Sequence, residues 1–242
     1  MKLTKVMGHR GAALLAPENT LASIRAAAAT GVKWVEIDVY PIAQGGLIIF
    51  HDHTLERCTN GFGNTLEANL ETMLSLDAGS WFGAEHDGEK VPTLEQAIDC
   101  IQVLGLGLNL EIKYEDADVE RVVPPILAVL SERWQDNDKL MISSFNYEAL
   151  QICYREDKQR HLGYLVEDVP SDWLLKLAAI EAFSLNCYYA VLTEQQARAV
   201  KSAGYKLLCY TANEAHLVER HWDWGMDTII TDDPNQFMHL ES

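Results

Sequence analysis

Titratable side chains occur at three places in the first fifty-one residues where the surrounding sequence is typical of a buried strand. A histidine and an arginine follow the apolar run 3–7, two acids interrupt the run 34–40, and a histidine follows the run 47–50. These five side chains are His9, Arg10, Glu36, Asp38 and His51. Burying a charge is unfavourable unless the charge is paired or bound to a metal. Packing alone does not explain three such places, so we interpret this part of the chain as a functional site.

The acidic residues among them have the spacing of a metal site. Glu36 and Asp38 are two residues apart on one predicted strand and therefore point to the same face of the sheet. Glu111 and Lys113 have the same spacing on a later strand. Three converging carboxylates repel one another unless positive charge lies among them, and a hard divalent cation, Mg²⁺ or Ca²⁺, meets that need. The alternative is an exposed edge strand with outward carboxylates, which the apolar neighbours disfavour.

The histidines and the cations suggest chemistry on a phosphate. Imidazole titrates nearest to neutral pH, so His9 and His51 could exchange protons with an attacking and a leaving oxygen. A lone histidine is more often structural, but two histidines beside a carboxylate cluster favour catalysis. Arg10 and Lys113 are fixed positive charges that, together with a metal ion, could clamp a phosphate. Salt bridges to the same carboxylates are the alternative, and both interpretations can hold together.

The remaining titratable residues carry weaker signals. Asp52, His53 and Asp77 are candidates for supporting contacts around the site. Five further histidines are predicted in loops or helices and at the surface: His86, His161, His216, His221 and His239. The five cysteines are widely spaced and form no CxxC motif, so we interpret them as small buried hydrophobic residues in a reducing compartment.

The elements that position these residues alternate regularly along the 242 residues. Eight strands, each followed by helical periodicity, are predicted to begin near residues 4, 34, 107, 140, 161, 183, 206 and 228. Such alternation implies a parallel sheet with right-handed crossovers, and eight units in about 250 residues match a closed (β/α)₈ barrel. An open doubly wound sheet is the alternative, weakened because residues 8–11 form no nucleotide-binding fingerprint. In a barrel the active site lies at the C-terminal strand ends, where the residues above fall.

The chain is predicted to be one domain, 1–242, with an inserted segment at about 53–91. The insertion has scattered glycines among polar residues, and a long irregular segment in a compact domain is usually functional. The run 47–50 is predicted to be a hairpin-like extension of the second strand. Helices are predicted at 21–30, 92–103, 119–134, 147–156, 171–179, 193–203, 214–222 and 234–240.

Charge and hydropathy exclude several classes of partner. The net charge is -17, from 36 acidic and 19 basic residues, which disfavours nucleic acid or an anionic membrane surface as a partner. No apolar run approaches the roughly 20 residues that a membrane-spanning helix needs. The first strand begins so close to Met1 that we expect no signal peptide and a cytoplasmic location. No feature of the sequence predicts an oligomeric state.

Several short motifs occur in a fixed order along the chain. They are His9-Arg10-Gly11, Pro17-Glu18-Asn19-Thr20, Glu36-Ile37-Asp38-Val39, His51-Asp52, Pro92-Thr93-Leu94, Glu111-Ile112-Lys113, Tyr210-Thr211-Ala212-Asn213 and the closing Gly225-Met226-Asp227-Thr228-Ile229-Ile230-Thr231-Asp232. Over essentially the whole chain, this set closely resembles the glycerophosphodiester phosphodiesterases. The resemblance implies a (β/α)₈ barrel and hydrolysis of glycerophosphodiesters, such as glycerophosphocholine or glycerophosphoethanolamine, to sn-glycerol 3-phosphate and an alcohol.

The resemblance also implies roles for individual residues. By this likeness Glu36, Asp38 and Glu111 hold one divalent cation, for which we expect Mg²⁺, with Ca²⁺ as the alternative. His9 and His51 would act as general acid and base.

The remaining implied roles concern the substrate. By the same likeness Arg10 and Lys113 would bind the phosphate. Tyr210 stands where the family often has Trp and would form one wall of the substrate site. The nucleophile is left open between water and the glycerol 2-hydroxyl, which would form a cyclic phosphate. The short insertion and the lack of a signal resemble the cytosolic bacterial branch.

Two other functions are alternatives. A phospholipase of the related phosphoinositide or sphingomyelin type would need a way onto membranes, which the net charge disfavours. A non-catalytic phosphate- or sugar-binding barrel would be expected to lack one of His9, His51 or the carboxylates, and all are present.

Overall fold

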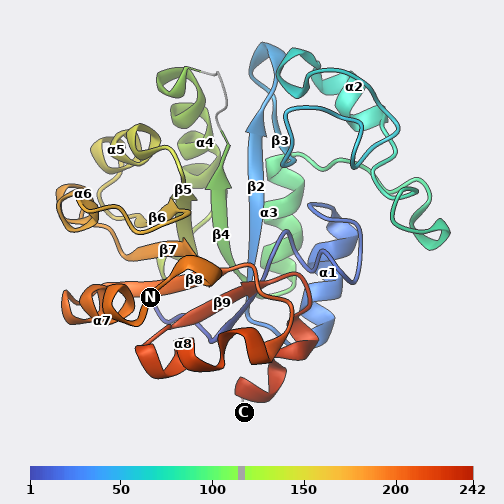
Figure 1. Ribbon diagram of the computed structural model, residues 1–242. Coiled ribbons are helices and arrows are strands. Elements are labelled where there is room, and N and C mark those ends of the chain that lie inside the picture. Colours follow the sequence, from blue (N-terminus) through green and yellow to red (C-terminus); the bar gives the residue numbers. More distant parts are fainter. Residues whose placement is uncertain (114–117, 242) are drawn as a thin grey trace.

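The computed structural model describes residues 1–113 and 118–241, in which eight parallel strands form a closed barrel (Figure 1). The strand order is β1-β9-β8-β7-β6-β5-β4-β2, and pairing of β1 with β2 closes the ring. The predicted (β/α)₈ barrel is confirmed, and the doubly wound alternative is wrong. The barrel strands are β1 (Val6–Gly8), β2 (Trp34–Pro41), β4 (Gly107–Ile112), β5 (Leu140–Ser144), β6 (His161–Val166), β7 (Ser184–Tyr188), β8 (Lys206–Tyr210) and β9 (Thr228–Thr231).

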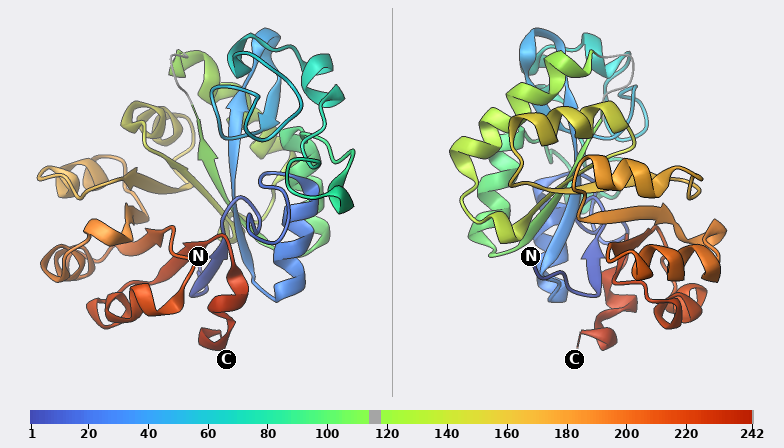
Figure 2. Two further views of the ribbon diagram at one scale, coloured as in Figure 1. Left: turned by 45° about the vertical axis from the view of Figure 1, so that its right-hand side comes forward. Right: turned by 90° about the vertical axis from the view of Figure 1, so that its left-hand side faces the viewer.

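Figure 2 shows from two further directions that the helices form an outer layer around these strands. They are α1 (Leu21–Thr30), α3 (Leu94–Val103), α4 (Val119–Arg133), α5 (Tyr147–Glu156), α6 (Trp173–Ala179), α7 (Glu194–Ser202) and α8 (Glu219–Trp224). The predicted helix 21–30 is confirmed: the Thr20 hydroxyl accepts a hydrogen bond from Ser23 N, and left-handed Gly31 ends the helix.

Two helix predictions near the C-terminus need correction. The predicted helix 214–222 is a 3₁₀ turn at Ala215–Val218 followed by α8. The predicted helix 234–240 consists of two 3₁₀ turns, Pro234–Gln236 and Met238–Leu240. Between them Phe237 leaves helical geometry, with φ −120° and ψ −6°, and its side chain is fully buried. Burying this ring stabilises the fold more than continuing a short helix would.

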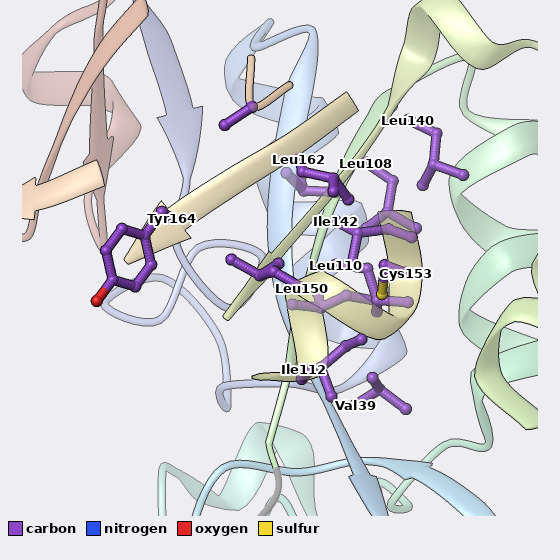
Figure 3. Packing of buried hydrophobic residues seen from close by; sticks show 14 of the residues in the cluster. Val39, Leu108, Leu110, Ile112, Leu140, Ile142, Leu150, Cys153, Leu162 and Tyr164 are labelled. Atoms are coloured by element: carbon purple, nitrogen blue, oxygen red, sulfur yellow. The ribbon is translucent and has the colours of Figure 1, made fainter. Parts of the chain in front are cut away.

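Alternation along the strands separates packing from function. On β4, Leu108, Leu110 and Ile112 belong to the large hydrophobic core between strands and helices. Figure 3 shows Leu108 and Leu110 near Ile142 of β5 and Leu150 and Cys153 of α5. Because successive side chains point to opposite faces, the other two buried side chains of β4, Asn109 and Glu111, point into the barrel.

The lower part of the barrel interior is filled by apolar side chains. Met7, Trp34, Met141, Leu208 and Ile230 form a separate buried cluster. Gly107 leaves room for the indole, because a Cβ there would lie 2.5 Å from the Trp34 ring. Substrate access from this end is therefore blocked by packing, and the open end is the one at the C-terminal strand ends.

The segment after β2 departs from the regular pattern. β3 (Leu47–Ile49) pairs antiparallel with β2, as predicted for the hairpin-like extension. Residues 53–91 then run mostly without regular structure, apart from α2 (Leu70–Ser75) and short 3₁₀ turns, and lie beside the end of β2 (Figure 1). A second buried cluster joins this segment to β2 and β3 through Tyr40, Ile48 and Met73.

Two further observations concern the helices and the cysteines. Within residues 1–113 and 118–241, no helix combines the length and the apolar character that crossing a bilayer requires. All five cysteines are free thiols, and four of them are buried, as expected for small hydrophobic residues.

The turn after β1 predicts a measurable effect on stability. Gly11 has φ +85°, and a Cβ there would lie 2.4 Å from Ser23 Oγ and 2.6 Å from the Ser23 carbonyl carbon. We expect Gly11→Ala to lower the free energy of unfolding by roughly 3 kcal/mol, from backbone strain and overlap together. Gly45→Ala is the matched control, because Gly45 has φ +84° but nothing within 4 Å. Gly45→Ala should lower the free energy of unfolding by about 1 kcal/mol. If urea denaturation gave the same loss for both variants, overlap with Ser23 could not be contributing.

Candidate active site

Three buried carboxylates meet at the C-terminal ends of two neighbouring strands. Glu36 and Asp38 come from β2 and Glu111 from β4, and Asp38 is the direct partner of Glu111 in the parallel register. Oxygen atoms of the three lie within 4.8 Å of one another. They are 3%, 1% and 7% exposed, respectively. The structure thus brings together the three acids that the sequence predicts as metal ligands.

The electrostatics of this trio depend on where positive charge lies. Burial, together with the charges of Asp38 and Glu111, raises the pKa of Glu36 well above its usual range. Burial also raises the pKa of Glu111 to about 7, although the Lys113 ammonium opposes the shift. Burial would raise the pKa of Asp38 too, but Lys113 and Arg10 outweigh it and lower that pKa. Asp38 is therefore the acid with the strongest compensation from cations.

The trio fits a hard cation. Among the described residues, Glu36 Oε1 is buried without a hydrogen-bond partner, although buried polar atoms normally have one. The opposite oxygen, Oε2, accepts a hydrogen bond of 3.0 Å from the Arg10 amide. A carboxylate oxygen that is left open beside two further carboxylates suits a divalent ion with oxygen ligands.

A neighbouring asparagine holds Asp38, one of the three acids, in place. Asn19 Nδ2 donates to Asp38 Oδ2 at 2.8 Å, and Asn19 Oδ1 accepts from the Asp38 amide at 3.1 Å. The side chain is 2% exposed, and its backbone adopts a left-handed conformation with φ +58°. The sequence showed Asn19 only as part of the motif Pro17-Glu18-Asn19-Thr20, so its contact with Asp38 was missed.

His9 follows β1 and is held by a residue from the other end of the chain. Its Nδ1 lies 2.6 Å from Asp232 Oδ1, and the ionised carboxylate can only accept, so Nδ1 carries the hydrogen. Burial raises the pKa of Asp232, but the contact with His9 outweighs burial and lowers it. Asn213 donates to the second oxygen of Asp232 at 2.8 Å. Nε2 of His9 lies 3.8 Å from Glu36 Oε2, so this nitrogen faces the carboxylates.

His51 is held in the same manner. Its Nδ1 lies 2.7 Å from Asp52 Oδ1, which leaves Nε2 for the cavity. Burial lowers the pKa of His51, while the hydrogen bond to Asp52 opposes that effect. A neutral ring at pH 7 is the consequence. Both histidines thus have a carboxylate that fixes ring orientation and tautomer.

The two cations pair with the carboxylates, the alternative weighed from the sequence. Lys113 Nζ lies 2.5 Å from Glu111 Oε1 and 3.2 Å from Asp38 Oδ1. Arg10, whose backbone has φ +50°, reaches Glu18 at 2.6 Å and Asp38 at 3.5 Å. Burial lowers the pKa of each cation, but the nearby acids outweigh it and raise both. Both therefore stay charged beside the trio.

One cavity of about 300 Å³ collects these groups. Its polar side is lined by His9, Arg10, Glu36, His51, Asn109, Glu111 and Lys113, and its other side by Phe145, Leu165, Tyr188, Tyr210, Thr211 and Ile230. The Tyr210 ring centroid lies 5.9 Å from that of Phe145 and 6.4 Å from that of Tyr188. Its hydroxyl donates to the Val166 carbonyl at 2.8 Å, so the ring is fixed against the cavity.

The other candidate residues lie in different surroundings. His53 contacts the Tyr40 hydroxyl at 3.4 Å, and Asp77 ties a turn of the insertion by accepting from the Gly79 and Ser80 amides. Two predictions of surface histidines are wrong. His221 is only 7% exposed because α8 packs it against the Tyr189 carbonyl, and His161 is a partly buried residue of strand β6 rather than of a loop or helix.

The sequence interpretation also missed Arg57. This side chain contacts both Asp52 and Glu18 and thereby reaches the surroundings of His51 and Arg10. A signal was present, because Arg57 and Lys90 are the only arginine or lysine residues among seven acids in the insertion 53–91. A cation that is rare among many acids marks a position where charge is needed.

Comparison with known proteins agrees with this geometry. The model of the glycerophosphoryl diester phosphodiesterase family matches residues 9–236. Over 238 residues the chain is 32% identical to a glycerophosphodiester phosphodiesterase of Caldanaerobacter subterraneus subsp. tengcongensis, covering 98% of this chain and 97% of that protein.

Two solved structures are similar along nearly the full length. An Oleispira antarctica phosphodiesterase in complex with the product sn-glycerol-3-phosphate has a TM-score of 0.95 and 38% identity, covering 98% of this chain and 96% of that one. A glycerophosphodiester phosphodiesterase from Agrobacterium tumefaciens has a TM-score of 0.82 and 25% identity, covering 98% and 100%.

The matched region 9–236 contains the carboxylate trio, both histidines, both cations and the aromatic wall. The match therefore includes the residues of the cavity and is not confined to the scaffold. The resemblance first seen in the short motifs is confirmed. This chain is an enzyme that belongs to the glycerophosphoryl diester phosphodiesterase family.

Proposed function

We propose that this chain hydrolyses small glycerophosphodiesters, such as glycerophosphocholine and glycerophosphoethanolamine, to sn-glycerol 3-phosphate and an alcohol. The observation that carries the proposal is the single cavity, with histidines, carboxylates and cations on one side and an aromatic wall on the other. The complex of the Oleispira antarctica relative with sn-glycerol-3-phosphate supports a product of this kind.

Glu36, Asp38 and Glu111 would hold one divalent cation. When bound, such an ion neutralises the non-bridging phosphate oxygens and stabilises the charge that develops on them. We favour Mg²⁺ over Ca²⁺, because Mg²⁺ is typically shared between protein carboxylates and a substrate phosphate, and a phosphodiester in this cavity would bring its phosphate to the trio. The unpartnered Glu36 Oε1 supports a divalent cation at this place, whichever of the two ions binds.

His9 and His51 would exchange the two protons of the reaction. One ring takes the proton of the nucleophile as its oxygen bonds to phosphorus, and the other ring gives a proton to the leaving alkoxide as the P–O bond breaks. The nucleophile is water, or the glycerol 2-hydroxyl with a cyclic phosphate that water then opens. Since Nδ1 of each ring is bonded to a carboxylate, Nε2 is the nitrogen for these transfers.

The remaining cavity residues would bind the substrate. Arg10 and Lys113 would contact the phosphate oxygens while keeping their carboxylate partners, since each cation has several donors. Tyr210, with Phe145 and Tyr188 beside it, would pack against the carbon skeleton of the substrate.

The alternatives have less support. A membrane phospholipase is disfavoured by the net charge of -17. A non-catalytic binding barrel leaves unexplained why two carboxylate-anchored histidines share a cavity with the acidic trio. We further propose that residues 1–242 act as one domain with 53–91 as an insertion, in the cytoplasm and without nucleic-acid partners.

Removal of the metal should abolish activity. We expect EDTA to stop the release of choline from glycerophosphocholine, and Mg²⁺ to restore it more fully than Ca²⁺. Glu36→Gln and Asp38→Asn keep the side-chain volume but remove the charge, so each should lower kcat by at least about 100-fold. Glu132→Gln, at an exposed acid of α4, is the control. Turnover that survives EDTA would rule out the metal role.

Metal binding should depend on pH through Glu111. Its pKa of about 7 means that the metal-free trio carries a proton below pH 7, which the cation must displace. Apparent affinity for Mg²⁺ should therefore rise by about tenfold per pH unit below pH 7 and level off above about pH 8. Calorimetry at pH 6 in two buffers of different ionisation enthalpy should detect at least one released proton, because the pKa of Glu36 is raised as well. An affinity that is constant from pH 5 to 8 would contradict this origin of the pH dependence.

Removal of either histidine should slow the chemical step. We expect His9→Ala and His51→Ala each to lower kcat by about 100- to 10,000-fold on glycerophosphocholine. The leaving group of a p-nitrophenyl ester needs no proton. With such a substrate, only the variant that lacks the general acid should regain activity. His216→Ala, at an exposed histidine, is the control. Full activity in both His9→Ala and His51→Ala would refute acid–base catalysis by this pair.

A further inference from the structure

Arg57, in the segment that follows β3, binds two carboxylates at once. Its Nε and Nη2 donate to Asp52 at 2.5 and 2.8 Å, and its Nη1 and Nη2 donate to Glu18 at 2.7 and 2.8 Å. The planar guanidinium is suited to such a double fork, whereas an ammonium is not. The contact joins parts of the chain that are 39 residues apart.

Each of these carboxylates continues to a side chain of the cavity. Asp52 Oδ1 lies 2.7 Å from His51 Nδ1, and Glu18 Oε1 accepts a hydrogen bond of 2.6 Å from Arg10 Nη1. These contacts form one connected row, His51, Asp52, Arg57, Glu18 and Arg10, in which the charges alternate from Asp52 to Arg10. Arg57 occupies the centre of this row and does not line the 300 Å³ cavity. Arg57 can therefore affect a bound substrate only through His51 and Arg10, the two ends of the row.

The contacts of Arg57 set the charge state and position of its neighbours. Burial raises the pKa of Glu18 and of Asp52, but hydrogen bonds with Arg57, Arg10 and His51 outweigh burial and lower both. Without the guanidinium, two ionised carboxylates would face each other and repel. Asp52 would then be free to turn away from His51, and Glu18 from Arg10.

We propose that Arg57 is a positioning residue, which orients His51 through Asp52 and Arg10 through Glu18 for attack on the phosphodiester. The inference rests on the proposed function of the cavity. It assigns a catalytic purpose to the segment after β3, because this segment brings Arg57 to Asp52 and Glu18.

The competing explanation is an ordinary surface salt bridge. Arg57 is 47% exposed, and exposed ion pairs usually contribute little to stability. The chain offers a matched control in Arg155, which is 55% exposed and also binds two carboxylates, Glu120 and Glu156, away from the cavity lining. If kcat falls in Arg57→Ala but not in Arg155→Ala, the loss comes from the connected row and not from the removal of a surface charge.

The experiment measures kcat, KM and Tm of the full chain with glycerophosphocholine and Mg²⁺. Arg57→Ala should lower kcat by about 10- to 100-fold, as loss of a partner that orients an active-site ligand usually does. Its Tm should shift no more than that of Arg155→Ala, whose kcat should stay unchanged. Arg57→Lys keeps the charge but loses the fork, so its kcat should fall between those of Arg57→Ala and the unchanged chain.

A cycle with His51→Ala supplies a readout that a merely structural role would not affect. Adding Arg57→Ala to His51→Ala should lower kcat by a clearly smaller factor than in the unchanged chain, because only the arm through Glu18 and Arg10 is left to lose. An equal loss in both backgrounds, or an unchanged kcat in Arg57→Ala alone, would overturn the positioning role. Absence of turnover in the unchanged chain would instead overturn the proposed function itself, so the two failures are distinguishable.

Discussion

The burial of three carboxylates on two neighbouring strands is the constraint on which the site depends. Glu36, Asp38 and Glu111 are all less than 10% exposed, and their mutual repulsion opposes folding unless positive charge lies among them. Arg10 and Lys113 each pair with Asp38, so three acids face two cations and one negative charge is left over. Burial, together with this excess, raises the pKa values of Glu36 and Glu111, and the excess explains why the trio suits a divalent ion.

Compensation of that charge extends outward from the barrel. Arg10 pairs with Glu18, Glu18 with Arg57, and Arg57 with Asp52, which in turn holds His51. Exposure is 1% at Asp38, 16% at Arg10 and 10% at Glu18, but 47% at Arg57, so solvent screens the charge of Arg57 more than the charges nearer the trio. The same charges that make burial of the trio tolerable also orient the groups proposed to act on the phosphate. Stability and function therefore share one set of contacts here.

Local periodicity explains which parts were predictable. Each barrel strand alternates between a face of aliphatic side chains and a face of interior ones, so the eight strands and the inward acids Glu36, Asp38 and Glu111 follow from the sequence. Short helices were less predictable, because tertiary burial decided them. Phe237 interrupts the predicted helix 234–240 to bury its ring, and α8 places His221 inside against the Tyr189 carbonyl. Neither contact leaves a periodic pattern in the neighbouring residues.

The sequence by itself determined the barrel, the residues at its strand ends and, through short motifs, the family. Only the tertiary structure decided which of these groups meet. His9 meets Asp232 across 223 positions because barrel closure brings β9 beside β1, and Arg57 meets Glu18 because the segment after β3 folds back over the turn after β1. The polarity of a side chain indicates whether the residue is buried, so strands can be inferred from the alternation of polar and apolar residues along a short stretch of sequence. Contacts between loops depend on how the whole barrel closes, and no local pattern encodes that.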